Sequence, residues 1–146
     1  MDRTGAVIAV VGAGCLVGAQ APINATLGRS IGRLPAATVS FAVGLAVLLV
    51  VTAAASGFGG VANISGAPWW ALTGGLFGAV YVTVALTTVG RLGAGGVTAA
   101  TVAGQLTASV LIDGLGLFGV ERQPVTATRI AGIALLALGV YLVVRD

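Results

Sequence analysis

The sequence contains no histidine and no lysine, and Cys15 is its single cysteine. One cysteine excludes an internal disulfide and a cysteine-based metal cluster. The absence of histidine also excludes histidine-ligated zinc and Ser-His catalytic pairs. We therefore expect no metal and no cofactor.

Charge is scarce as well. Charged residues make up 8% of the 146 residues and hydrophobic residues 58%, with a mean hydropathy of +1.10. A soluble domain carries about 25% charged residues, so this chain has too few to cover a water-facing surface. The composition predicts an integral membrane protein. The seven arginines are scattered rather than clustered, so a nucleic-acid partner is not expected.

The apolar residues fall into runs of about 20, the length that crosses a bilayer as a helix. Glycine, proline and arginine separate the runs, and no room remains for a soluble domain. The first run could pass for a signal peptide, but four more follow it. We expect one all-α, five-helix transmembrane domain over residues 1–146, with approximate spans at 5–27, 35–56, 68–89, 95–116 and 125–144.

Glycine occurs 24 times, in places four residues apart. Small residues at that spacing let helix backbones approach closely in lipid. The pairs Gly14 with Gly18 and Gly74 with Gly78 are therefore expected to mark helix-packing faces, either within one chain or between two.

Polar residues are concentrated in the first, third and fourth runs. Polar groups inside a membrane face the bundle interior or a watery cavity. We therefore expect these three helices to line a cavity and the second and fifth to face lipid or to support it. The candidate substrate-binding residues are Gln20, Asn24, Tyr81, Thr101, Gln105 and Ser109.

Four polar residues of the fourth run recur at every fourth position, namely Thr101, Gln105, Ser109 and Asp113. Each step of four turns about 40° round a helix, so they form one slowly drifting stripe. The stripe fits either a solute path or hydrogen bonds that only join helices. Asp113 lies near one end of its span, where it could exchange a proton or serve as a helix-end residue.

The positive-inside rule gives almost no preference for either orientation of a five-helix chain in the membrane. Three arginines fall on the N-terminal side and four on the other. Either the N-terminus lies outside, or the chain inserts both ways and opposite copies pair as an antiparallel dimer of ten helices. The second arrangement, which we favour, would reproduce the inverted repeats of transporters with a site between the halves.

Several segments resemble, in order and spacing, the short YdcZ-type family of the drug/metabolite transporter superfamily. They are AQAPINATLGR (19–29), LPAATVSFAVG (34–44), PWWALTGGLFGAVYV (68–82), GQLTASVLIDGLGLFG (104–119) and TRIAGIALLALGV (128–140). The resemblance implies five-helix subunits that pair with themselves or with a sister protein. The positions that match the family pattern would be Pro22, Asn24, Gly44, Pro68, Trp69, Gly104, Gln105 and Asp113. The related small multidrug exporters carry a glutamate in helix one, which this chain lacks.

The leading functional hypothesis is a multi-pass transporter of a small solute in a bacterial inner membrane, working by alternating access. A non-transporting scaffold or accessory subunit is the alternative. An enzyme is not expected, because a lone Asp113 supplies neither a paired carboxylate nor an activated nucleophile. The expected partners are lipid, a small-molecule substrate and a second copy or sister subunit.

Overall fold

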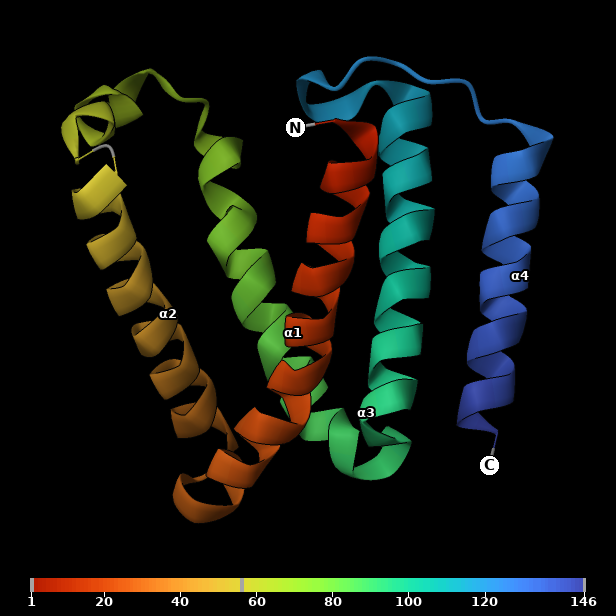
Figure 1. The fold of residues 1–146 in the computed structure, drawn as a ribbon, viewed down its shortest axis with the longest axis horizontal. Coiled ribbons are helices and arrows are strands. Elements are labelled where there is room, and N and C mark those ends of the chain that lie inside the picture. Colours follow the sequence, from red (N-terminus) through yellow and green to blue (C-terminus); the bar gives the residue numbers. More distant parts are fainter. Residues whose placement is uncertain (1, 56, 146) are drawn as a thin grey trace. The chain divides into compact units, whose positions relative to one another are not determined.

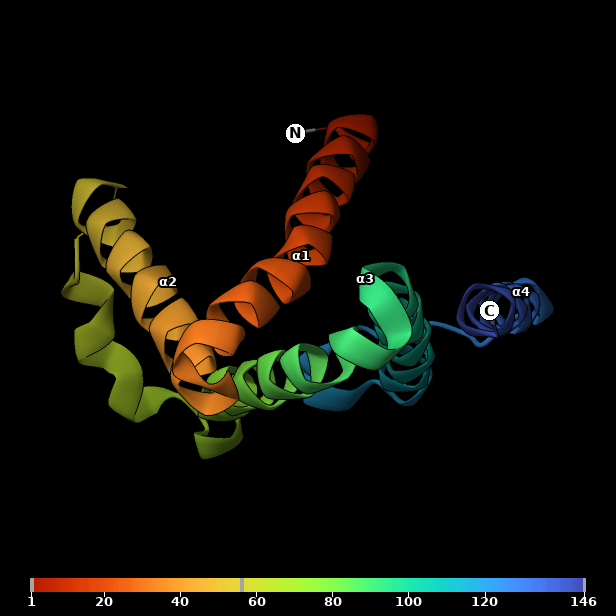
Figure 2. The ribbon, with the colours of Figure 1, turned by 90° about the horizontal axis from the view of Figure 1, so that it is seen from below.

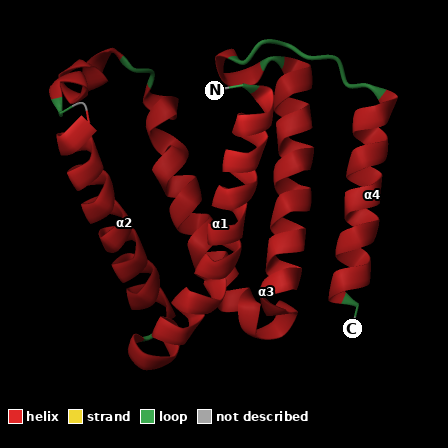
Figure 3. Cartoon of the chain, viewed as in Figure 1, coloured by secondary structure: helices red, strands yellow, loops and turns green. Residues whose placement is uncertain are grey.

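The computed structural model describes residues 2–55 and 57–145, and this part of the chain contains helices and no strand (Figures 1 and 3). The α-helices are α1 (Arg3–Ile31), α2 (Arg33–Ala55), α3 (Gly74–Leu115) and α4 (Ala127–Val144). Short 3-10 helices are η1 (Gly59–Gly66), η2 (Trp69–Thr73) and η3 (Leu117–Gly119). All four α-helices are long and apolar enough to cross a membrane.

Helix α3 contains two of the five expected spans. Its 42 residues would extend about 63 Å as a straight helix, roughly twice the 30 Å of a hydrocarbon core. Gly93 interrupts it with φ 68° and ψ 168°, a backbone conformation that is essentially restricted to glycine. The part of the chain that the structure describes therefore has four to five long apolar helices, depending on whether α3 is counted as one helix or as two that meet at Gly93.

The third expected span begins later than its sequence suggests. Pro68 is extended, with ψ 139°, and residues 69–73 form the 3-10 helix η2. The Thr73 hydroxyl donates to the Trp70 carbonyl at 2.7 Å, which supports this tight turn. Regular α-helix starts only at Gly74.

The chain divides into two compact units. We call Ala19–Gly90 the central unit, and Met1–Gly18 with Arg91–Asp146 the terminal unit. Each unit packs apolar helical segments together, and each has its own small set of buried residues.

In the central unit, α1 and α2 meet at the tight turn drawn in orange in Figures 1 and 2. Gly32 lies in this turn with φ +90°, which glycine adopts without strain. The core beside it consists of small residues, and Ala36 is completely buried. A Cβ on Gly28 would lie 3.5 Å from Leu86 Cδ2, an ordinary van der Waals distance, so α1 and α3 pack against each other here.

In the terminal unit, two glycines of α3 lie close to valine side chains from the last part of the chain. A Cβ on Gly96 would lie 3.3 Å from Val144 Cγ2, and one on Gly114 only 2.6 Å from Val125 Cγ2. Thr126 caps α4, because its hydroxyl oxygen accepts from the Arg129 amide at 3.3 Å. These glycines leave room for the two valines, so α4 and the preceding loop lie close to α3 at these points.

Most large apolar side chains of the described residues are exposed. A soluble protein buries such side chains, but on membrane-spanning helices they face lipid tails. Trp69 is 78% exposed in the short helix before α3, as expected of an aromatic residue at the membrane interface.

Candidate functional site

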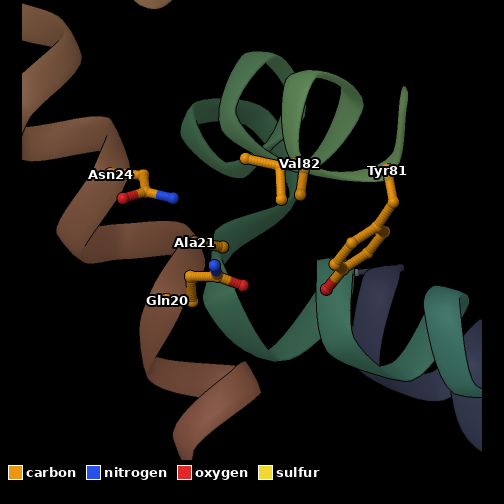
Figure 4. Close-up of a pocket in the computed structure, with 6 residues that line it drawn as sticks. Gln20, Ala21, Asn24, Tyr81 and Val82 are labelled. Carbon is orange, nitrogen blue, oxygen red and sulfur yellow. The ribbon is translucent and has the colours of Figure 1, made fainter. Parts of the chain in front are cut away.

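A polar recess lies between α1 and α3 in the central unit (Figure 4). It is lined by Gln20, Ala21, Asn24, Tyr81, Val82 and Ala85. Gln20 and Asn24 are four residues apart, which places both on one face of α1. Figure 4 shows their amides projecting toward α3 and the Tyr81 hydroxyl directed back toward Gln20. Three of the expected substrate-binding residues are therefore brought together.

Asn24 is the buried polar residue of the described chain, with 6% of its surface exposed. No hydrogen bond joins its amide to another described residue, yet no fully buried side-chain nitrogen or oxygen there is left unpaired. The amide atoms must therefore remain accessible at the recess. A polar group in this position has its hydrogen-bonding capacity free for a ligand.

The recess itself is narrow. It is open on one side, and no water-sized sphere fits inside it. A larger groove, with a volume of about 660 Å³, lies beside it and shares one residue with it, Gln20. Gln20 therefore lies where a solute held in the groove would meet the polar recess.

Helix α2 lines this groove, a role that its apolar sequence did not indicate. It contributes Thr38, Ser40 and Phe41 among others, and the Phe41 ring lies 3.5 Å from where a Cβ on Gly78 would be. The polar residues of the short run Thr38-Val39-Ser40 were the only indication in the sequence that α2 could line a groove. The sequence of one helix does not show which neighbouring helix it will face.

The polar stripe of α3 lies in the terminal unit. Thr101 is half-buried, whereas Gln105 and Ser109 are exposed. None of the three lines the recess or the groove of the central unit. The stripe thus forms a second set of polar residues, which belongs to the terminal unit, whereas the recess belongs to the central unit.

Asp113, the last member of the stripe, is paired. Its Oδ2 lies 3.2 Å from Nη1 of Arg129 in α4, and about a third of each side chain is exposed. The Asp113 carbonyl accepts from the Gln123 amide at 2.9 Å, and Arg122 Nε donates to the Gly114 carbonyl at 2.9 Å. These bonds fasten the end of α3 to the start of α4, which is the helix-end role that the sequence left open.

The glycine pairs differ in their surroundings. A Cβ on Gly18 would lie 3.7 Å from Thr98 Oγ1, and Gly78 faces Phe41. Gly14 and Gly74 have no atom within 4 Å of such a Cβ. The closest glycine contacts are at Gly96 and Gly114, and neither was predicted from the sequence. Gly114 has no small residue four positions away, whereas Gly96 begins a series of small residues at that spacing, with Ala100 and Gly104.

Metal ligands are not grouped in the described residues. No cluster of three or more His, Cys, Asp or Glu is found among residues 2–55 and 57–145, and Cys15 is exposed and free.

Comparison with known families decides the general function. The model of the family described as "Putative inner membrane exporter, YdcZ" matches residues 5–142. The chain belongs to the YdcZ family. It is therefore a multi-pass inner membrane protein of a transport family, with membrane lipid and a small-molecule substrate as partners, and an exporter family is not an enzyme class. No curated protein and no solved structure is significantly similar to the chain.

Proposed function

We propose that this YdcZ-family protein moves a small polar or amphipathic solute by alternating access, with Gln20, Asn24 and Tyr81 as its hydrogen-bonding residues. The observation that carries the proposal is the buried Asn24, whose amide has no protein partner and borders a recess. Its amide atoms stay accessible at the recess. Their hydrogen-bonding capacity is therefore available to a ligand.

The chemistry of the recess narrows the solute class. Two amides and a phenol supply donors and acceptors but no charge, and residues 19–90 contain no Asp or Glu. The adjoining groove, of about 660 Å³, is of the size of small-molecule pockets, roughly 300–1,000 Å³. Its wall is largely apolar. These features favour an uncharged solute with a polar end and an apolar body.

In the proposed assembly, the five segments form one transmembrane domain and two copies pair in opposite orientations. Gln105 and Ser109 are exposed in one chain, although polar residues inside a membrane face protein or water. A second copy would cover them. Together with Thr101 they would then border the solute path, and the open glycines Gly14 and Gly74 would provide close helix contacts between copies.

Reporter fusions at the C-terminus test the opposed orientation. We expect both a cytoplasm-active and a periplasm-active reporter to give signal, because the arginines are divided almost equally between the two sides. A signal from only one reporter would remove self-pairing in opposite orientations and leave a sister subunit or a fixed orientation.

The transport proposal is tested with the purified chain in two steps. A panel of uncharged and amphipathic metabolites is first screened for compounds that raise the melting temperature, because a ligand of the folded state stabilises it. At a concentration 100 times the Kd the stabilisation is about 2.7 kcal/mol. The compounds found are then measured for flux into liposomes. Stabilisation without flux of any compound would favour the alternative, a non-transporting accessory subunit.

Asp113 is the proposed coupling group, if transport is coupled to protons. The charged groups facing it are Arg129 of α4, which is bonded to its carboxylate, and Arg122 of the loop, which binds the neighbouring carbonyl. Proton exchange would require Arg129 to move away from Asp113 during the transport cycle. The pH dependence of flux distinguishes this role from a static helix connection.

A further inference from the structure

The two charged residues of the central unit lie together at one end of it. Arg29 is in the last turn of α1 and Arg33 begins α2, and residues 19–90 contain no other charged residue. The ion pair of the described chain joins Arg129 to Asp113 and involves neither of them. Neither arginine therefore has a carboxylate partner among the described residues.

A groove with a volume of about 330 Å³ opens beside these arginines. It is lined by Ala25, Gly28, Arg29, Arg33, Leu86, Thr87, Val89 and Gly90. The two cations border it and most of its remaining wall is apolar. Gly28 lies in its wall, where a Cβ would be in ordinary van der Waals contact with the Arg33 Cα at 3.6 Å and with Leu86 Cδ2 at 3.5 Å.

Arg29 is held in place by its own helix. Its Nη2 donates to Thr26 Oγ1 at 2.9 Å, and the Thr26 hydroxyl donates to the Pro22 carbonyl at 3.0 Å. This chain of bonds uses one guanidinium nitrogen and leaves the other donors free. Guanidinium groups with free donors suit phosphate oxygens in both charge and geometry.

We propose that this groove binds an anionic membrane phospholipid, with Arg29 and Arg33 on its phosphate. The arginines lie at the end of a membrane-spanning helix, the depth at which long basic side chains reach the headgroup region. The apolar wall formed by Ala25, Leu86 and Val89 would lie against the first part of an acyl chain. A free phosphate ion would leave that wall uncovered, which is why a lipid is favoured over an inorganic anion.

The test measures lipid binding rather than transport. The purified full-length chain is reconstituted in nanodiscs of phosphatidylcholine containing a minor fraction of phosphatidylglycerol, and the lipids retained after extraction are counted by native mass spectrometry. We expect retention of phosphatidylglycerol to exceed its share of the membrane by about 25-fold, since each of the two arginines contributes roughly a fivefold preference near an anionic headgroup. In the double variant Arg29→Gln with Arg33→Gln, the preference should fall to near unity.

Arg3→Gln is the matched control, because Arg3 is an exposed arginine at the opposite end of α1. It should keep the full preference. The proposal is overturned if the double variant retains the wild-type preference, or if Arg3→Gln loses it equally, which would indicate a general charge effect. It is also overturned if inorganic phosphate at millimolar concentration displaces the lipid, because the groove would then be a simple anion site. Melting temperatures in pure phosphatidylcholine check that the double variant folds.

Discussion

Replacing Asn24 by leucine is expected to reduce solute flux by up to about 100-fold while leaving the fold intact. Asn24 is buried beside Ala21, Val82 and Ala85, with no protein partner for its amide. Losing a hydrogen bond to a solute in an occluded site costs roughly 1–3 kcal/mol, up to about 100-fold in binding. The protein itself loses no hydrogen bond, because the Asn24 amide has no partner among the described residues. Flux into liposomes and the melting temperature are the measurements.

The combination of these two readouts separates the functional roles. If Asn24 only joined helices, as the accessory-subunit alternative requires, the leucine variant would be less stable and would dissociate. Thr107→Val is the matched control, because it also removes polarity from a membrane helix. The Thr107 hydroxyl is already bonded to the Ala103 carbonyl at 2.8 Å and lies outside the recess. Wild-type flux by a correctly folded Asn24→Leu protein would refute the proposed site.

Reversing the charge of Asp113 is expected to destabilise the chain by about 2 kcal/mol, and exchanging the two charges should recover most of the loss. Asp113→Arg replaces the 3.2 Å attraction to Arg129 by repulsion between two cations. Because about a third of each side chain is exposed, the effect lies between that of a surface pair and that of a buried one. Melting temperatures of Asp113→Arg, Arg129→Asp and the double exchange measure it.

Glu121→Arg is the control for the change of net charge, since Glu121 is exposed and a surface substitution changes stability by about 0.5 kcal/mol or less. Equal destabilisation by Glu121→Arg would show that the ion pair between Asp113 and Arg129 does not itself stabilise the chain.

Asp113→Asn tests whether this residue couples transport to protons. A pH dependence of flux that disappears in Asp113→Asn supports proton coupling, and an unchanged pH profile leaves Asp113 with the helix connection alone.

The sequence by itself determined the class of protein and much of its layout. A chain with so few charges and such long apolar runs is stable only in a membrane. The thickness of the membrane sets the length of each run. Arg91 separated the third apolar run from the fourth in the sequence, and the structure has the break in the helical backbone two residues later, at Gly93. The spacing of Gln20 and Asn24 was also sufficient to place them on one face, because helical periodicity is local.

Only the tertiary structure decided which faces meet. It placed Tyr81 opposite Gln20 and Asn24, gave Asp113 the partner Arg129, and made α2 a wall of the large groove. In a membrane, burial of apolar surface does not select between neighbouring helices, since lipid is as apolar as leucine. The choice depends on where small residues such as Gly96 and Gly114 allow close approach, and that depends on the shapes of side chains from distant parts of the chain.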